Sequence, residues 1–232
     1  MRNVNDLDGD GYALADIILA GHQCEHIASS LPAVIGAGRG GIRNLITHPT
    51  VIRLLMHERL GQYLWSIIGR DLVAVKATLF DKTADANWRV QWHQDRAIAV
   101  KERLHVAGYG SWSTKAGTLH VEPPAEVLAQ MIAIRVHLDG CGSENGPMRV
   151  IPGSHRLGKL MDDELATVVS GGPAVELYAP QGSLVLMRPL LVHSSSSARA
   201  PQHRRVLHIE FAPPEAISPL QWHAAVPLRR AA

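Results

Sequence analysis

The sequence predicts a mainly β domain with flanking helices, an α+β fold in which a β-barrel follows a helical N-terminal part. The first observation is a broad apolar stripe with helical spacing after Thr50. The second is a change to alternating residues, clearest from Gln130 to Leu138. The third is the set of Gly, Pro and Ser turns between the later strand-like runs. Helices first and strands later is the order expected for a barrel backed by helices.

The N-terminal part, about residues 1–70, is expected to hold two helices. The first runs from Tyr12 to Leu31, and Pro32 ends it. The second follows Thr50, a residue type that caps helices, and ends at Gly69. Its apolar side chains form one broad stripe, made of Val51, Leu54, Leu55, Leu60, Leu64, Ile67 and Ile68.

The barrel is expected over about residues 71–215. Strands are predicted at residues 72–82, 130–138, 182–187, 190–193 and 204–211. The sequence has no internal repeat and no linker long enough to divide it. Its 232 residues therefore fit a single domain, residues 1–232, with a sizeable core.

Composition limits the possible functions. A formal net charge of +2 with scattered Lys and Arg gives no electrostatic basis for binding nucleic acid. No apolar run approaches the ~20 residues that span a bilayer, and the first residues lack a signal-peptide pattern. Two cysteines are too few for a disulfide framework, which indicates a reducing compartment. We therefore expect a soluble cytoplasmic protein without a nucleic-acid or membrane partner, whose oligomeric state the sequence does not indicate.

A pair of separated motifs predicts a metal site. In His93-Gln94-Asp95 the first and third side chains lie on one side of an extended strand, so both can reach one ion. His193 closes a second strand-like run far along the chain. Two histidines and one carboxylate are the facial triad of non-haem Fe(II) sites, which leaves the opposite face of the ion open.

A cationic residue follows the second histidine. Arg204 begins the strand-like run that ends at Phe211. From the next antiparallel strand, its guanidinium could enter the same barrel and bind a carboxylate in a bidentate manner. A metal ligand on one strand and an anion clamp on the next suggest a metal-bound dicarboxylate co-substrate.

Taken together, these segments resemble the phytanoyl-CoA dioxygenase family. The resemblance rests on the His93–Asp95 motif, on Asn145-Gly146-Pro147 followed by Pro152-Gly153-Ser154-His155, and on His193 with Arg204. It begins near Asp8-Gly9-Asp10-Gly11-Tyr12, which is similar to the family's opening segment, and extends to Phe211.

The resemblance implies a double-stranded β-helix, a jelly-roll barrel of the cupin-like kind. It also implies an oxygenase that depends on Fe(II), 2-oxoglutarate and dioxygen. By the family pattern, His93, Asp95 and His193 would hold iron. Arg204, assisted by Ser195, would bind the distal carboxylate of 2-oxoglutarate.

Candidates for substrate contact lie elsewhere. The segment from Lys101 to Pro124 fits neither periodicity and follows the metal motif, where an active-site lid would lie. It offers Trp112, Lys115 and His120, although Trp112 could equally pack on the barrel rim. Arg135, with His137 on the same strand face, is a further candidate, and a structural role beside Asp139 or Glu210 is the alternative. Lys76 and Lys82 could help to hold an anion, but exposed side chains are the expected state. His208 could lie in the barrel interior near Arg204, and the expected state is a satisfied core histidine.

We therefore expect an Fe(II)- and 2-oxoglutarate-dependent dioxygenase that hydroxylates a small-molecule metabolite or natural-product intermediate and releases succinate and CO₂. No basic cluster suited to a CoA phosphate is visible in the sequence. Desaturation, epimerisation or ring closure could follow the same hydrogen abstraction. Two alternatives stay open: a cupin-like metal-dependent isomerase or hydrolase that does not use 2-oxoglutarate, and a non-catalytic small-molecule-binding protein of the same fold.

Overall fold

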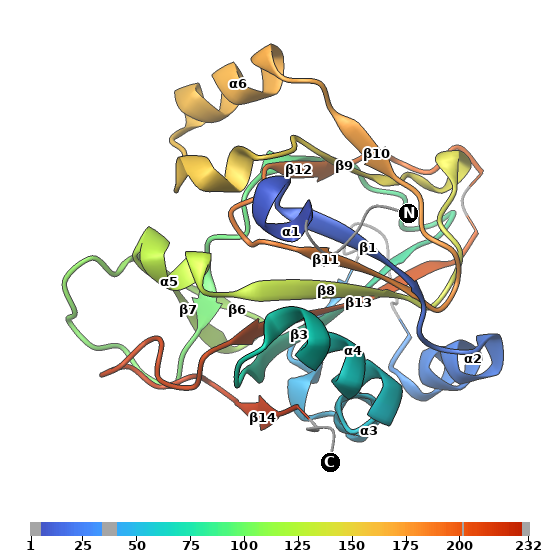
Figure 1. Ribbon diagram of the computed structural model, residues 1–232, viewed down its shortest axis with the longest axis horizontal. Helices are drawn as coiled ribbons and strands as arrows, with labels where there is room; N and C mark the ends of the chain where they lie inside the picture. Colours follow the sequence, from blue (N-terminus) through green and yellow to red (C-terminus); the bar gives the residue numbers. More distant parts are fainter. Residues whose placement is uncertain (1–5, 34–40, 201, 229–232) are drawn as a thin grey trace.

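The computed structural model describes residues 6–33, 41–200 and 202–228 (Figure 1). The α-helices are α1 (Asp6–Gly9), α2 (Gly21–Ser30), α3 (Pro49–Leu55), α4 (Glu58–Ile68), α5 (Ala125–Ala129) and α6 (Asp162–Gly171). Short 3₁₀ helices are η1 (Leu45–Thr47), η2 (Ser143–Asn145) and η3 (Ser154–Leu157). In the described part of the chain, no helix is long and apolar enough to cross a membrane.

The strands form three antiparallel sheets. The largest has the order β1 (Tyr12–Ile17), β11 (Ser183–Met187), β8 (Ile132–His137), β13 (Arg204–Ala212), β3 (Val73–Lys82) and β14 (Val226–Pro227), with β2 (Gly41–Ile42) also paired to β3. The second has the order β10 (Val175–Leu177), β9 (Met148–Val150), β12 (His193–Ser195) and β4 (Val90–His93). The third has the order β5 (Ile98–Ala99), β7 (Thr118–Glu122) and β6 (Gly110–Lys115).

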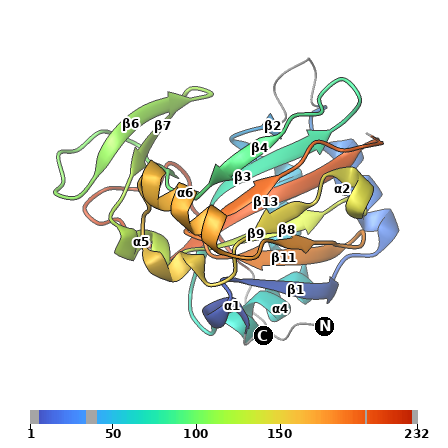
Figure 2. The ribbon, with the colours of Figure 1, turned by 90° about the horizontal axis from the view of Figure 1, so that it is seen from above.

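The first two sheets lie one above the other and enclose the barrel interior (Figure 1). Helices α3 and α4 cover the outer face of the large sheet, on the side away from β9 and β12. The third sheet projects to one side as a β6–β7 hairpin (Figure 2). This arrangement confirms the predicted mainly β fold with flanking helices.

The outer face of the large sheet holds the main hydrophobic core. Leu79 of β3, Ile134 of β8 and Leu207 of β13 pack in one cluster with Leu60 and Leu64 of α4. All five are almost fully buried. Burying one such side chain stabilises the fold by roughly 1.5–3 kcal/mol, so this helix–sheet contact fixes the sheet against its helical support.

The inner face of the same sheet is unusually polar. Cross-strand register places His208 of β13 between Thr78 of β3 and Arg135 of β8, and Arg204 opposite Lys82. Because the second sheet covers this face, its polar side chains are enclosed rather than solvated. Lys82 is 0% exposed, so the expectation of an exposed lysine is wrong there.

The N-terminal part departs from the predicted helices. Tyr12–Ile17 is strand β1 rather than the start of a helix, because it pairs with β11 at the edge of the large sheet. The second predicted helix is divided into α3 and α4, which His48 and His57 cap in place of Thr50. Its end at Gly69 is as predicted.

Two strand predictions also change in detail. The strand expected at residues 190–193 begins only at His193, because Leu191 N donates a hydrogen bond to Arg188 O in a turn. The segment from Lys101 to Pro124 is not a plain loop, since it contains β6 and β7. The other predicted strands agree with β3, β8, β11 and β13 to within a few residues.

Candidate metal centre

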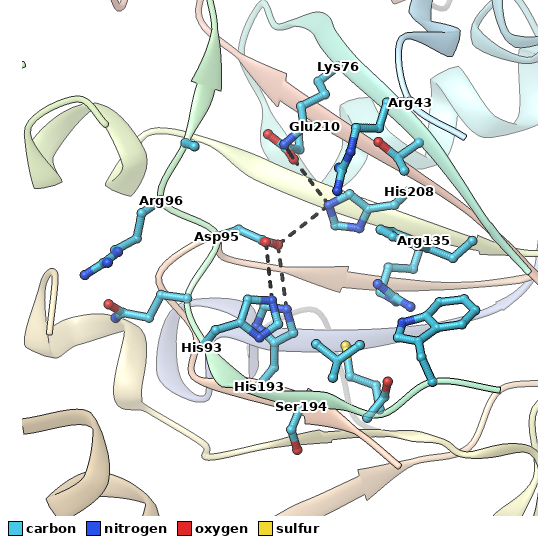
Figure 3. Close-up of a pocket in the computed structure, with 18 of the residues that line it drawn as sticks. Arg43, Lys76, His93, Asp95, Arg96, Arg135, His193, Ser194, His208 and Glu210 are labelled. Carbon is cyan, nitrogen blue, oxygen red and sulfur yellow. Dashed lines mark hydrogen bonds and ion pairs between the residues drawn. The ribbon is translucent and has the colours of Figure 1, made fainter. Parts of the chain in front are cut away.

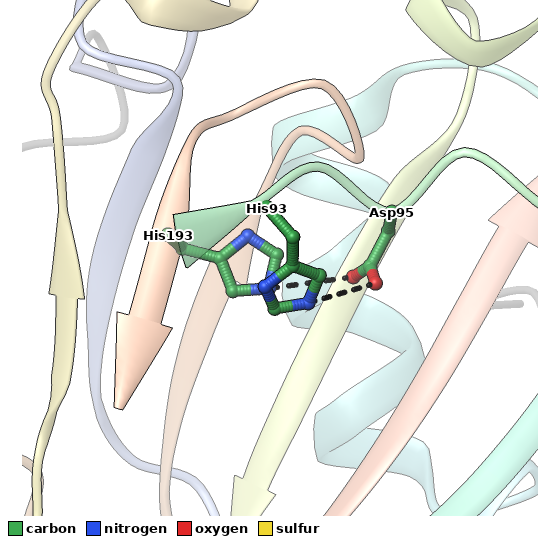
Figure 4. A group of neighbouring side chains, drawn as sticks. All are labelled: His93, Asp95 and His193. Carbon is green, nitrogen blue, oxygen red and sulfur yellow. Dashed lines mark ion pairs between the residues drawn. The ribbon is translucent and has the colours of Figure 1, made fainter. Parts of the chain in front are cut away.

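The three predicted metal ligands meet at one end of the second sheet. His93 is the last residue of β4 and His193 the first of β12, and the two lie opposite each other in the antiparallel pair. Their ring centroids are 4.1 Å apart. Asp95 follows β4, and its backbone N–H donates to Pro189 O at 2.9 Å. Figure 4 shows the two imidazoles and the carboxylate pointing toward one another.

Donor distances and hydrogen bonds fit a bound cation. The Nε2 atoms of His93 and His193 each lie 3.7 Å from a carboxylate oxygen of Asp95. The Nδ1 atom of each ring lies 2.9 Å from a backbone carbonyl, that of Gln91 or Leu191 respectively. A carbonyl that accepts from Nδ1–H leaves Nε2 with its lone pair free for a metal. Among the described residues, this is the one group of three such side chains that could hold an ion.

The electrostatics favour the metal-binding protonation states of His193 and Asp95. Burial lowers the pKa of His193 to about 3, assisted by His93, so the ring is neutral. Burial alone would raise the pKa of Asp95, but His193, His208 and His93 lower it overall. Two imidazoles and one carboxylate form a donor set that fits Fe(II) and leaves one face of the ion open.

Gln94, between the two ligands of the motif, has a structural role. Its side-chain amide donates to the carbonyls of Gly158 and Leu190, both at 2.8 Å. Its carbonyl oxygen accepts from Leu160 N at 2.9 Å. These bonds hold the strand end in place and engage both polar atoms of the Gln94 amide with backbone groups.

A cavity of about 360 Å³ opens beside the triad (Figure 3). The charged side chains that line it are mostly cationic. The cations are Arg43, Lys76, Arg96, Lys115, Arg135 and Arg204, whereas the acids are Asp95 and Glu210. The excess of positive charge indicates that the cavity receives anions.

Arg204 lies at the inner end of this cavity. It is 3% exposed, and its Nη1 donates to Gly146 O at 2.9 Å. Its buried Nε has no hydrogen-bond partner within the described structure. Lys82 lies beside it and donates to Ser195 Oγ at 3.1 Å and to Ser196 O. Arg204 and Ser195 thus both line the cavity, and Lys82 contacts Ser195 while lying opposite Arg204.

The charges at this inner end repel one another. Burial and then Arg204 lower the pKa of Lys82 to about 7 and that of Arg135 to about 10. Burial, Arg135 and Arg204 lower the pKa of His137 to about 3. A buried group of cations without a carboxylate partner is a site prepared for an anionic ligand.

A second polar network lies on the other side of Asp95. His208 Nε2 lies 3.8 Å from an Asp95 oxygen and 3.5 Å from Glu210 Oε1, and Glu210 accepts from Lys76 Nζ at 2.6 Å (Figure 3). His208 lines the cavity, and its Nδ1 has no partner in the described structure. The expectation of a satisfied core histidine is therefore wrong. The signal was the alternation of Arg204, His208 and Glu210 on one face of one strand.

Of the four residues predicted to contact the substrate, two line the cavity and two do not. Arg135 and Lys115 line the cavity. Trp112 packs against the apolar cluster under the β6–β7 hairpin, with the Arg103 guanidinium 5.2 Å from its ring. His120 is buried, and its Nδ1 lies 2.9 Å from Thr118 O. Neither Trp112 nor His120 lines the cavity, whereas Arg43 and Arg96, which sequence reasoning missed, do.

Sequence comparisons agree with this geometry. The family model described as phytanoyl-CoA dioxygenase matches residues 37–206. L-proline trans-4-hydroxylase of Streptomyces griseoviridis is 31% identical over a segment covering 34% of this chain and 40% of that enzyme. The match therefore spans less than half the length of this relative.

Solved structures share the fold. AviO1 from Streptomyces viridochromogenes Tue57 has 25% identity and a TM-score of 0.66, covering 92% of this chain and 95% of that one. EctD from S. alaskensis, solved with 2-oxoglutarate and 5-hydroxyectoine, has 16% identity and a TM-score of 0.71, covering 98% of this chain and 86% of that one. At 16% identity, the second likeness shows the fold alone.

The family match covers well over half of the chain, including all three predicted metal ligands and Arg204. The donor set of His93, Asp95 and His193 fits the metal of that family. This chain belongs to the phytanoyl-CoA dioxygenase family, the Fe(II)- and 2-oxoglutarate-dependent oxygenases that its motifs resemble.

Proposed function

We propose that this protein uses Fe(II), 2-oxoglutarate and dioxygen to hydroxylate a small-molecule metabolite or natural-product intermediate, with release of succinate and CO₂. The observation that carries this proposal is the convergence of His93, Asp95 and His193 beside a cavity that also contains Arg204. A metal site and a buried anion site in one cavity suit a dicarboxylate that chelates the metal.

The metal ligands would be His93 Nε2, His193 Nε2 and the Asp95 carboxylate. When bound, iron with 2-oxoglutarate and dioxygen supplies an oxidant strong enough to take a hydrogen atom from an unactivated C–H bond. The protein holds the donors in place through the carbonyls of Gln91 and Leu191 and through Gln94. Because Asp95 supplies a carboxylate ligand, no coordination position is left vacant for halide, and halogenation is disfavoured.

The co-substrate would extend from the metal toward the inner end of the cavity. There, Arg204 would bind its distal carboxylate with charge-assisted hydrogen bonds, and Ser195 would add a further one. Gly146 O orients the guanidinium, and Lys82 Nζ holds Ser195 Oγ. These contacts would set the orientation of 2-oxoglutarate before the reaction begins.

The rest of the cavity would receive the substrate. Arg135 and Lys115 would contact it directly, since both line the cavity. Trp112 and His120 would act from the β6–β7 hairpin that carries Lys115, by fixing its position. The cavity volume of about 360 Å³ limits the substrate to a small molecule.

Hydroxylation is the proposed outcome because the curated relative is a hydroxylase. The solved structures of this fold also include an epimerase, SnoN, and a carbocyclase, SnoK, both from nogalamycin biosynthesis. One fold hosts several reactions, and the contacts within the site determine which of them occurs.

A metabolite screen tests the proposal. Fe(II)-loaded protein under air should convert 2-oxoglutarate to succinate, and a true substrate should stimulate that release and gain one oxygen atom by mass spectrometry. Asp95→Ala should abolish succinate formation, whereas Asp85→Ala, an exposed aspartate in the turn after β3, should retain it. Equal succinate formation by the Asp95→Ala protein and the wild type would refute the proposed metal centre.

A further inference from the structure

Two cations at the mouth of the cavity have no partner among the residues that the structure describes. Arg43 and Lys115 both line the cavity, and both are exposed. Within the described structure, neither side chain makes an ion pair or a hydrogen bond with another residue. The other cations there have a role already: Lys76 pairs with Glu210, Arg96 contacts Glu122 and Leu160 O, and Arg204 is assigned to 2-oxoglutarate.

A hydrogen bond joins the segments that carry these two cations. Asn44, next to Arg43, donates its side-chain N–H to Ala116 O, next to Lys115, at 2.8 Å. Both Asn44 and Ala116 have left-handed backbone conformations, with φ of 62° and 50°. Asparagine tolerates this conformation, and Ala116 adopts it together with Gly117, φ 79°, in the two-residue turn between β6 and β7. The hydrogen bond between the two segments brings Arg43 and Lys115 to the same edge of the cavity.

The strand register separates Arg43 and Lys115 from Arg204 and Lys82 at the inner end of the cavity. Ile42 of β2 pairs with Leu79 of β3, so Arg43 follows beside Thr78, in the row of His208. Lys82, beside Arg204, lies four residues further along β3, which is about 13 Å of extended strand. Asp95, near His208, lies on the Thr78 side. The cavity thus has two separate cationic ends.

The charges at the mouth are close enough to influence each other. Although Lys115 is exposed, partial desolvation of its amine lowers its pKa, and the neighbouring positive charges of Lys76 and Arg43 lower it further. An anion bound between Lys115 and Arg43 would relieve this repulsion.

We propose that Arg43 and Lys115 form a subsite that binds an oxyanion of the substrate, a carboxylate or a phosphate, at the end of the cavity opposite Arg204. This assignment rests on the proposed function and specifies its substrate class. The two cations come from separate segments that only the fold brings together, so no local run of basic residues marks the subsite in the sequence.

Calorimetric titration of the anaerobic Fe(II)–2-oxoglutarate complex with three probes tests the subsite. The probes are benzoate and phenylphosphonate, with neutral benzamide as the isostere of benzoate. At least one anion should bind at least tenfold more tightly than benzamide. The anion that binds more tightly indicates whether the substrate carries a carboxylate or a phosphate. Arg43→Gln with Lys115→Gln should weaken that binding at least tenfold. The matched charge control, Arg59→Gln with Lys101→Gln, replaces two exposed cations outside the cavity and should change nothing.

Anions that bind no more tightly than benzamide, or that bind the double variant as they bind the wild type, would overturn the subsite. An equal loss of anion affinity in the control variant would also overturn the subsite. The visible charge-transfer band of the Fe(II)–2-oxoglutarate complex should form in the wild type and in the Arg43→Gln, Lys115→Gln double variant, because Arg204 is intact in both. If the band is absent from wild-type protein, the proposed function itself fails, which separates the two failures.

Discussion

Lys82 and Arg204 lie opposite each other on strands β3 and β13, so two buried cations share one corner of the cavity. Lys82 donates a hydrogen bond to Ser195 Oγ, and Arg204 donates one to Gly146 O. Two like charges buried side by side destabilise the ligand-free protein. The arrangement is explained if a dicarboxylate neutralises them.

Binding of 2-oxoglutarate should depend on pH through Lys82. Burial and Arg204 lower the pKa of Lys82 to about 7, so Lys82 loses its proton above that pH in the ligand-free protein. A bound dianion favours the charged amine, so binding takes up a proton and affinity should fall as pH rises above 7, by up to about tenfold per unit. Titrations between pH 6 and 9 should show this slope in the wild type. Lys82→Met should flatten it, and a slope unchanged in that variant would contradict the role of Lys82.

The same lowered pKa predicts a change in stability. Between pH 7 and the ordinary lysine pKa, the unfolded chain holds a proton at Lys82 that the folded chain has lost. The contribution of Lys82 to the free energy of unfolding should therefore rise with pH across that window. Urea unfolding of the ligand-free wild type and of Lys82→Met at several pH values measures their free energies of unfolding. As pH rises, the free energy of the wild type should increase relative to that of Lys82→Met.

Arg204→Gln should weaken 2-oxoglutarate binding by roughly 10- to 150-fold, which corresponds to about 1.5–3 kcal/mol for hydrogen bonds to a charged group. Binding of Fe(II) itself should change little, because Arg204 is not a ligand. The neighbouring Arg205 is a suitable control, since it pairs with Asp139 at 2.7 Å and does not line the cavity. Arg205→Gln should lower stability without altering 2-oxoglutarate affinity, and equal affinities for the two variants would refute the assignment of Arg204.

Gly146 connects a sequence motif to the anion site. Its φ is +62°, and a Cβ atom there would lie 2.3 Å from Ser196 O. Its own carbonyl holds Arg204. Gly146→Ala should therefore destabilise the protein by about 2 kcal/mol or more and weaken 2-oxoglutarate binding. Gly142→Ala, where a Cβ meets nothing within 4 Å and φ is −99°, should leave both unchanged. Chemical unfolding and calorimetry measure the two effects.

Lys76 and Glu210 form a largely buried ion pair with side chains 20% and 5% exposed. Removing one partner leaves the other charge without compensation, so Lys76→Met or Glu210→Gln should each destabilise the protein by about 3 kcal/mol. Lys76→Met combined with Glu210→Gln should cost clearly less than the sum of the two single losses. Additive losses in the double variant would show that the two side chains do not act as a pair.

Much of the site could be predicted because its residues follow strand periodicity. His93 and Asp95 share a face by alternation, and His193 and Arg204 come from later strands that sequence patterns located. The surroundings of the polar face of the large sheet are harder to predict from the sequence. Alternation separates the two faces of a strand but does not say whether the polar face meets solvent or a closed cavity, which is why Lys82 and His208 were misjudged.

Long-range pairing accounts for the remaining differences. Tyr12–Ile17 forms a strand because β11, which lies far along the chain, offers an edge to pair with, as in Tyr12 opposite Met187. Arg43 reaches the cavity because β2 pairs with β3 and Asn44 bonds to Ala116. No local pattern near Arg43 records either contact.

Anaerobic titration of the Fe(II)-loaded protein with 2-oxoglutarate, followed by visible absorption, tests the metal centre most directly. We expect a weak charge-transfer band that saturates at one equivalent of co-substrate in the wild type and is lost in Asp95→Ala and His193→Ala. A wild-type protein that binds Fe(II) yet develops no band, or a band that survives both substitutions, would contradict the account.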